Sequence, residues 1–360
     1  MNTDVVFLNA CRGLPTARIP VWLMRQAGRY LPTYRELRRS YDLLTMIRTP
    51  ELAAQVTLQP LAEFELDAAI IFSDILPPLE GMGLELSFAS GKGPVIGNPI
   101  ERSYDIDLLA APPAAEIMAP SLEAIRLVKH ELKGRGTPLI GFAGAPFTLA
   151  SYAVEGGGSR SYARVKALMY REPSAWKRLM TKLVTVQSDY LLRQVDAGAD
   201  ALQVFDSFVG LALGPDDYER YVAPYNRVLF AALAKREVPV IHYSGGTGAY
   251  LETVAASGGD VLSVDWRIAL DEARRRVGRG RPIQGNLDPV AMLAPWRELR
   301  AHIDTVLAKA GEEPGYIFNL GQGLLPGTPV DNVKRLVDYV QRYSTSETHK
   351  QPQARTEEGP

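Results

Sequence analysis

The chain has 360 residues, 46% hydrophobic and 22% charged, which is typical of a folded globular protein and excludes disorder across the body of the chain. Its 40 lysines and arginines nearly balance its 41 aspartates and glutamates. The overall charge therefore gives no support to nucleic-acid binding or membrane-surface binding, and any anion site must be local.

The cysteines and histidines argue against a disulfide and against a metal centre. The single cysteine, Cys11, excludes an intramolecular disulfide and a thiolate cluster, which fits a reducing compartment. No two of the histidines have metal-ligand spacing; they are His130, His242, His302 and His349. The first residues lack a basic leader followed by an apolar core, and no run of about 18 apolar residues occurs. We therefore expect a cytoplasmic protein of enzyme size, with no metal and no membrane contact.

Eight short apolar runs recur along the chain, with segments between them long enough for one or two helices. They lie at 20–24, 68–72, 138–142, 201–205, 239–243, 261–265, 281–285 and 316–320. Strands that are apolar throughout are buried on both faces, as parallel strands covered by helices are. The intervening segments predict helices; in 174–198, for example, apolar positions recur every three or four residues up to Gly198.

The alternation predicts an α/β fold, a (β/α)8 TIM barrel, in a single domain spanning residues 1–343. An open doubly wound sheet is the alternative, but no Gly-rich dinucleotide turn follows the first run. Residues 84–100 alternate apolar and polar around "ASGKG", which predicts a short β-hairpin inserted after the second strand. Residues 344–360 have almost no apolar side chains and predict a disordered tail.

Charged residues follow the first two predicted strands. In a TIM barrel the active site lies at the C-terminal ends of the strands. Arg25 and Arg29, in "LMRQAGRY", follow the first strand, and Asp74 follows the second. Arginine binds carboxylate or phosphate in a planar, bidentate way, so the pair indicates a polyanionic ligand. Asp74 places a carboxylate beside them, although an aspartate in that position can also be a helix cap or a turn residue.

The arginines farther along the same segment need another explanation. The sequence "YRELRRS" supplies Arg35, Arg38 and Arg39, which we assign mostly to a solvent-exposed helix face. The loop "LGQGLLPGTP" after the last run fits either a phosphate site or a tight turn at the rim of the barrel.

Several other residues at predicted strand ends have a structural and a functional interpretation. A tyrosine such as Tyr152 can be a core residue or a hydroxyl donor. Phe205 and Ser207 fit strand packing and a turn, or a stacking surface and a donor. His242 fits a hydrogen-bonded core histidine better than a ligand. Asp265 and Asp288 are candidate acids, but "GNLDP" also fits a turn.

The chain resembles the uroporphyrinogen III decarboxylase family over residues 5–343. The matching motifs, in the family's order, are "PVWLMRQAGRYLPTYRELR", "IIFSDIL", "GFAGAPFTLASYAVEGGGS", "QGNLDP" and "FNLGQG". The resemblance implies a TIM barrel that works as a homodimer. It also implies conversion of uroporphyrinogen III to coproporphyrinogen III in tetrapyrrole biosynthesis, by loss of four acetate carboxyls without a metal or organic cofactor.

The resemblance also implies which residues form the site. The catalytic residues are Asp74, which contacts the pyrrole nitrogens, together with Arg25, Arg29 and Tyr152. The substrate-binding residues are Arg25, Gln26, Ala27, Gly28, Arg29, Asp74, Tyr152, Phe205, Ser207 and Gln322. Gln322 stands where the family has a histidine in a "GHG" loop. Glutamine can hydrogen-bond a carboxylate, but it neither transfers a proton nor carries charge.

The chemistry of these residues agrees with a decarboxylation that needs no cofactor. Loss of CO2 from an acetate arm leaves a carbanion unless the pyrrole ring, protonated on carbon, accepts the electrons. Asp74 can oppose the positive charge on that ring, and the arginines can hold the carboxylate arms. Arginine has a pKa above about 12, so the proton donor stays open between Arg25 and a bound water.

Two alternatives remain. One is a tetrapyrrole-binding homologue whose catalysis is weakened because Gln322 replaces the histidine. The other is a zinc-dependent methyltransferase on the same fold. Such an enzyme needs histidine and cysteine ligands, and the single Cys11 precedes the first predicted strand.

Overall fold

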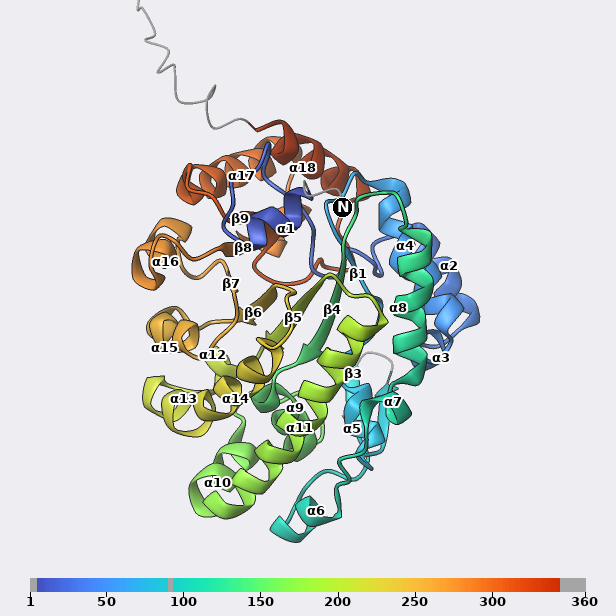
Figure 1. Cartoon of the computed structure of the whole chain (residues 1–360), viewed down its shortest axis with the longest axis vertical. Helices are drawn as coiled ribbons and strands as arrows, with labels where there is room; N and C mark the ends of the chain where they lie inside the picture. The colour runs from blue at the N-terminus through green and yellow to red at the C-terminus, as the bar shows by residue number, and fades with distance from the viewer. Residues whose placement is uncertain (1–4, 90–92, 344–360) are drawn as a thin grey trace, which may run out of the picture.

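A parallel sheet of seven strands curls through the centre of the molecule, with helices around it (Figure 1). The computed structural model describes residues 5–89 and 93–343, so the predicted tail lies outside the described residues. In sheet order the strands are β1 (Ala69–Ile70), β4 (Leu139–Gly144), β5 (Ala201–Asp206), β6 (Val240–Ser244), β7 (Val261–Val264), β8 (Ile283–Leu287) and β9 (Tyr316–Leu320). Each of these seven strands overlaps a predicted apolar run, which confirms the α/β class with a parallel sheet. The eighth strand of the predicted closed barrel is not part of this sheet.

The helices that cover the outside of the sheet and pack their apolar faces on it range from 8 to 25 residues in length. They are α4 (Pro50–Glu63), α8 (Ala119–Glu131), α11 (Pro173–Ala197), α14 (Ala223–Leu233), α16 (Leu270–Val277), α17 (Trp296–Ala310) and α18 (Val330–Arg342). The predicted helix at 174–198 is α11, which begins at Pro173 and ends before Gly198, a glycine with a φ of 118°. No helix in the described ranges is long and apolar enough to cross a bilayer.

The other helices lie in the connections between the strands and the covering helices. They are α1 (Val6–Cys11), α2 (Pro32–Ser40), α3 (Leu43–Arg48), α5 (Pro77–Gly81), α6 (Ser103–Leu108), α7 (Ala114–Ile117), α9 (Pro146–Glu155), α10 (Ala163–Arg171), α12 (Val209–Ala212), α13 (Pro215–Tyr221) and α15 (Leu251–Ala256). Two 3-10 turns, η1 (Gly248–Tyr250) and η2 (Pro289–Leu293), follow β6 and β8. Among these helices, α5, α9 and α12 directly follow β1, β4 and β5 and therefore shape the C-terminal end of the sheet.

The predicted first strand, at 20–24, is not a regular strand. It makes one isolated parallel bridge, between Val21 and Phe318 of β9. On its other side the Val21 carbonyl accepts from the Asp67 N–H at 2.9 Å, two residues before β1. Side chains occupy its own N–H groups: Val21 donates to Asp67 (2.8 Å), Leu23 to Gln26 (3.0 Å) and Met24 to Asn319 (3.0 Å). The segment thus lies between β9 and β1, but it cannot form a ladder because its donors are already used.

A buried polar layer connects this segment to the rest of the sheet. The Trp22 indole N–H donates to the Gln284 Oε1 of β8 at 2.8 Å. The amide of Gln284 donates in turn to Gln203 of β5 at 3.0 Å and to Ser263 of β7 at 2.9 Å. All four side chains are fully buried. Residues from distant strands therefore meet inside the curl of the sheet.

The 84–100 segment contains an antiparallel pair, β2 (Leu86–Ala89) and β3 (Gly93–Ile96), with residues 90–92 outside the described residues. Val95 of β3 forms an antiparallel bridge with Gly157, and the Ile96 N–H donates to the Gly156 carbonyl at 2.9 Å. The pair therefore lies beside the chain that leaves α9.

Candidate active site at the strand ends

Polar and aromatic residues gather at the C-terminal ends of the parallel strands. We call this end of the sheet the rim. Arg25 reaches it directly from the 20–24 segment, with a φ of 62° that is uncommon for a residue with a side chain. Its stem lies against Gly323, because a Cβ on that glycine would come within 2.4 Å of Arg25 Cδ. The Leu324 N–H also donates to the Met24 carbonyl at 2.9 Å. The loop after β9 therefore sets the course of the Arg25 side chain.

Asp74 enters the rim four residues after β1. Its Oδ1 accepts from the Leu76 N–H at 3.0 Å, which fixes the carboxylate at the entrance to α5. Burial raises the pKa of Asp74, and the Leu76 N–H and the positive charge of Arg25 oppose that rise. Asp74 is thus both a turn residue and a residue of the rim. Its carboxylate lies close enough to Arg25 for their opposite charges to interact.

Tyr152 of α9 joins Arg25 and Asp74. Burial raises the pKa of Tyr152 to about 12; the negative charge of Asp74 adds to the rise and Arg25 opposes it. The phenol is therefore protonated at neutral pH and can donate a hydrogen bond. Its ring packs against Phe208, with the centroids 5.0 Å apart. The structure thus brings together three residues that are far apart in the sequence.

Phe205 presents an aromatic face beside Tyr243, a residue that sequence reasoning missed. The two are partners in the β5–β6 register, with ring centroids 5.7 Å apart. The Tyr243 hydroxyl donates to the Gly321 carbonyl of the loop after β9, at 3.0 Å. Burial and the nearby Asp265 raise the pKa of Tyr243, while Arg267 and Arg25 lower it. The charges of two cations, from the 20–24 segment and from the chain after β7, thus act on the Tyr243 phenol.

Ser207 is linked to the preceding residue, Asp206, through the hydroxyl of Thr148. The Ser207 N–H donates to Thr148 Oγ1 at 2.9 Å, and that hydroxyl donates to Asp206 Oδ1 at 3.3 Å. Asn226 donates to the other carboxylate oxygen, Oδ2, at 2.9 Å. Asp206 is fully buried, and burial raises its pKa to about 7 against these two hydrogen bonds. Since neighbouring residues on a strand face opposite sides, Asp206 supports the rim from the helix side of β5.

The side chain of Gln26, in the segment expected to bind substrate, is buried and hydrogen-bonded to the main chain. Only 1% of the residue is exposed. Its Oε1 accepts from the Leu23 N–H and its Nε2 donates to the Ala68 carbonyl, both at 3.0 Å. The amide therefore fastens the rim segment to the chain entering β1. The main chain of Gln26 is engaged as well, because its N–H donates to the Leu23 carbonyl at 2.9 Å and its carbonyl accepts from the Tyr30 hydroxyl at 2.8 Å.

The rest of the 25–29 segment surrounds a tight turn at the rim. A Cβ on Gly28 would lie 3.0 Å from the Arg25 carbonyl, so the close approach needs a glycine. Ala27 is half-buried and Arg29 is exposed. Arg35, assigned by sequence to the surface, is exposed but donates to the carbonyls of Arg29 (3.1 Å) and Tyr30 (2.7 Å). It stabilises the turn that carries Arg29.

Gln322 is an exposed side chain between two buried glycines. The Gly321 N–H donates to the Leu287 carbonyl at 2.7 Å, and the Gly321 carbonyl accepts from Tyr243. The backbone of this loop is thus tied to β6 and β8. Within residues 5–89 and 93–343, no hydrogen bond uses the amide of Gln322.

Other candidates have structural roles. His242 is fully buried, its Nδ1 lies 3.2 Å from the Gly258 carbonyl, and burial lowers its pKa to about 3. Asp288 Oδ1 accepts from the Val290 N–H at 2.9 Å, so it is the turn residue that "GNLDP" indicates. Asp265 lies at the rim, but its carboxylate bonds Gly246 and Arg267. Among residues 5–89 and 93–343, no three His, Cys, Asp or Glu side chains are grouped as metal ligands.

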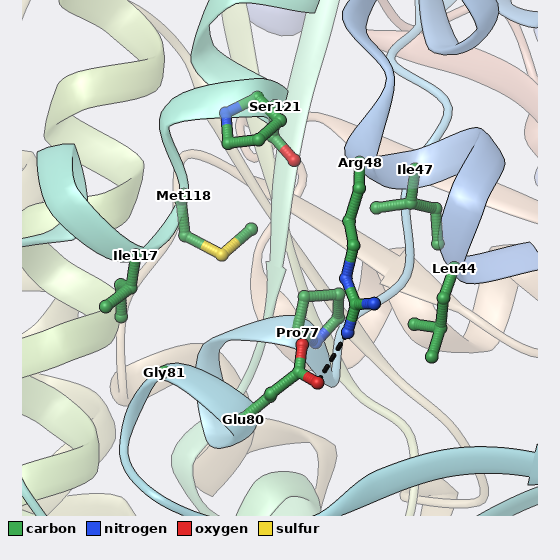
Figure 2. A pocket seen from close by; sticks show the side chains of 10 residues that line it. Leu44, Ile47, Arg48, Pro77, Glu80, Gly81, Ile117, Met118 and Ser121 are labelled. Carbon is green, nitrogen blue, oxygen red and sulfur yellow. Dashed lines mark hydrogen bonds and ion pairs between the residues drawn. The ribbon is translucent and has the colours of Figure 1, made fainter.

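A small pocket of about 150 Å³ lies away from these residues, on the outer side of α5 (Figure 2). It is lined mainly by apolar side chains from α3, α5 and the α7–α8 region, including Leu44, Ile47 and Met118. An ion pair between Arg48 and Glu80, 2.5 Å apart, lies at its edge, as Figure 2 shows. None of the residues that line this pocket is one of the candidate site residues.

Comparison with known proteins gives a consistent result. The family model described as Uroporphyrinogen decarboxylase (URO-D) matches residues 2–343. A uroporphyrinogen decarboxylase of Roseiflexus sp. is 51% identical over 343 residues, covering 94% of this chain and 98% of that protein. One from Thermus thermophilus is 50% identical over 336 residues, covering 93% and 97%.

Among solved structures, a methyltransferase from Methanosarcina mazei aligns with a TM-score of 0.78 at 22% identity. The alignment covers 94% of this chain and 97% of that one. At this identity the likeness concerns the fold alone.

Proposed function

The chain belongs to the uroporphyrinogen decarboxylase family, and from this premise we propose that it is a carboxy-lyase acting on uroporphyrinogen III. It removes the four acetate carboxyl groups and leaves coproporphyrinogen III, a step of tetrapyrrole biosynthesis. The observation that carries the proposal is the meeting of Arg25, Asp74 and Tyr152 at one end of the sheet, where their charges influence one another.

The reaction needs an electron sink, and the substrate supplies its own. Protonation of a pyrrole ring carbon makes the ring cationic. The bond between the acetate methylene and the carboxyl then breaks, its electrons enter the ring, and CO2 leaves. A proton on the methylene carbon then gives the methyl group, and the ring carbon releases the proton that it took up, which restores the neutral pyrrole. The net consumption is therefore one proton for each CO2 released.

Asp74 is suited to stabilise this cationic ring. Its carboxylate is fixed by the Leu76 N–H before any substrate arrives, so little reorganisation is needed when the positive charge develops. It can accept the pyrrole N–H groups, and partial burial strengthens its interaction with the ring. Preorganised electrostatic contacts of this kind are often worth about 3–4 kcal/mol in the transition state.

The arginines and Tyr152 act on the carboxylates and on the orientation of the substrate. Arg25, whose positive charge acts on Asp74, and Arg29 of the same turn can bind acetate or propionate arms in a bidentate way. The protonated phenol of Tyr152 can donate to the substrate. Phe205 offers a face for the macrocycle, and Ser207, Gln322 and the main chain of 27–28 complete the contacts. The proton donor is Arg25 or a water that it binds.

The two alternative functions fit the site less well. A binding protein without catalysis would have no need of the supported Asp74 and Tyr152 beside Arg25. A zinc-dependent methyltransferase needs thiolate or imidazole ligands at the rim. Cys11 lies on α1, and the following Gly13 approaches Pro282, which precedes β8, at the opposite end of the strands from the rim.

The family premise also supports an eight-unit barrel and a homodimer as proposals. In such a barrel the 20–24 segment is the eighth member of the ring, between β9 and β1. The cytoplasmic location stays a prediction from the sequence.

One assay tests the function. The purified protein is incubated with uroporphyrinogen III under anaerobic, reducing conditions, and the products are separated by their number of carboxyl groups. We expect intermediates with seven, six and five carboxyls and a four-carboxyl end product. A substrate that keeps all eight carboxyls would rule out the enzymatic function.

A further inference from the structure

Arg267 is a cation of the rim outside the set of residues described so far. It lies three residues after the end of β7, and β7 is four positions from β1 in the sheet order β1-β4-β5-β6-β7. In strand order, Arg267 therefore belongs to a part of the rim remote from Asp74, which follows β1.

The guanidinium of Arg267 is held on one edge only. Its Nη1 bonds Asp265 Oδ2, and its own N–H donates to Asp265 Oδ1 at 3.1 Å. The ring of Trp266 lies beneath it, 4.4 Å from the guanidinium carbon to the ring centroid. Yet the side chain is 49% exposed. Within the described ranges no hydrogen bond uses its Nε or Nη2, so the remaining edge is available to a ligand.

Asp265 is itself fixed, so the position of Arg267 does not depend on a mobile partner. Only 2% of Asp265 is exposed. Its Oδ2 also accepts from the Gly246 N–H at 2.8 Å, which ties it to the loop after β6. An arginine whose carboxylate partner is buried and anchored loses little conformational entropy when its free edge binds a second anion.

The contacts around Arg267 place it beside the proposed site. Trp266 adjoins Gly321: a Cβ on Gly321 would lie 2.7 Å from the main-chain nitrogen of Trp266. Gly321 precedes Gln322 and accepts the hydrogen bond of Tyr243. The positive charges of Arg267 and Arg25 both lower the pKa of Tyr243. The two arginines therefore act on one buried phenol.

We propose that Arg267 is a further substrate-binding residue, which holds a carboxylate arm of the macrocycle on the part of the rim remote from Asp74. This rests on the proposed function, because it assumes a macrocyclic ligand with carboxylates around its whole circumference. Asp265 acts as its positioning residue. Together with Arg25 and Arg29, Arg267 lets arms on distant pyrroles be bound at the same time.

The variants Arg267→Gln and Arg267→Lys test the proposal, with Arg275→Gln as the matched control. Arg275 is an exposed arginine of α16 whose Nε and Nη2 both bond Glu272, so its loss should not affect the site. Two quantities are measured: KM and kcat with uroporphyrinogen III, and the Kd for uroporphyrin. Uroporphyrin is the oxidised octacarboxylate, which does not react, and its Kd is read from fluorescence.

We expect Arg267→Gln to raise KM and Kd about ten-fold, the loss typical of one charge-assisted hydrogen bond, with kcat within about two-fold of the parent. Arg267→Lys should recover part of the affinity, and Arg275→Gln should match the parent. Unchanged KM and Kd in Arg267→Gln, or a fall in kcat alone, would overturn the proposal. If the parent protein itself does not decarboxylate the substrate, the proposed function fails, whereas the uroporphyrin titration still reports on Arg267.

Discussion

Asp206 shows how burial sets the chemistry of one residue in this protein. Its pKa rises from an ordinary value near 4 to about 7 because the carboxyl is buried beneath Ser207. Between about pH 4 and pH 7, Asp206 therefore keeps its proton in the folded protein and loses it in the unfolded chain. The sign is therefore the reverse of the usual carboxylate: this residue contributes stability at low pH, and the contribution is lost as pH rises from about 4 through about 7.

The variant Asp206→Asn should remove this pH dependence. Between pH 5 and pH 8, we expect the free energy of unfolding of the variant to improve relative to the parent by about 1–3 kcal/mol, measured by urea unfolding at both pH values. Asp331→Asn, at an exposed aspartate, should show no such change. An equal difference between variant and parent at both pH values would show that Asp206 titrates normally.

Gln322 offers a second test at the residue scale. In Gln322→His, the imidazole would be charged at pH 6 and neutral at pH 8. A charged donor binds a carboxylate more strongly than an amide does, so KM for uroporphyrinogen III should fall about 3- to 10-fold at pH 6 and be unchanged at pH 8. Steady-state kinetics at the two pH values measure this. Equal KM values for the variant and the parent at pH 6 would mean that the side chain is only a spacer.

Some residues of the site could be predicted from the sequence and others could not, for physical reasons. Arg25 and Asp74 were predictable because each directly follows an apolar run. Tyr243 was missed in favour of the adjacent His242. Neighbouring residues on a strand face opposite sides, and a run that is apolar throughout does not say which side is the interior. The hydrogen bonds of the Gln26 side chain could not be predicted, because its backbone partners, Leu23 and Ala68, are not visible in the sequence pattern.

At the scale of elements, the loop after β9 and the 20–24 segment depend on one another. Gly323 leaves the space that the stem of Arg25 occupies. In Gly323→Ala, the new methyl group should displace Arg25 without unfolding the sheet, so kcat/KM should fall about 10- to 100-fold while the melting temperature changes little. Product formation and thermal unfolding measure the two effects.

Gly327→Ala is the matched control, because no atom lies within 4 Å of the Cβ that it would add in the same loop. Its activity and melting temperature should equal those of the parent. If both alanine variants keep full activity, the course of Arg25 does not depend on Gly323.

The element that sequence reasoning got wrong is the first predicted strand. The apolar pattern of 20–24 indicates burial correctly, since Val21, Trp22 and Leu23 are fully buried. Burial does not ensure a ladder, however. Side chains from Asp67, Gln26 and Asn319 take the backbone donors, so the segment makes a single bridge and is free to turn outward at Arg25.

At the scale of the whole molecule, the curled parallel sheet was predictable because each strand is a compact apolar run between helices of regular periodicity. The proximity of the site residues in space cannot be predicted from that pattern. Asp74, Tyr152, Tyr243 and Arg25 meet only because the curl of the sheet brings strand ends together that are far apart in the chain. The resemblance to the family supplied the roles, and the geometry supplies the physical reason for them.

The central claim is that the carboxylate of Asp74 stabilises the cationic ring during decarboxylation. The most direct measurement compares the parent, Asp74→Asn and the control Asp288→Asn by product separation after incubation with uroporphyrinogen III. Both aspartates bond a nearby backbone N–H, but only Asp74 lies beside Arg25 and Tyr152. We expect the four-carboxyl product from the parent and from Asp288→Asn, with turnover of Asp74→Asn at least about 100-fold lower in a folded protein. Formation of the four-carboxyl product by Asp74→Asn at the parent's rate would contradict the account.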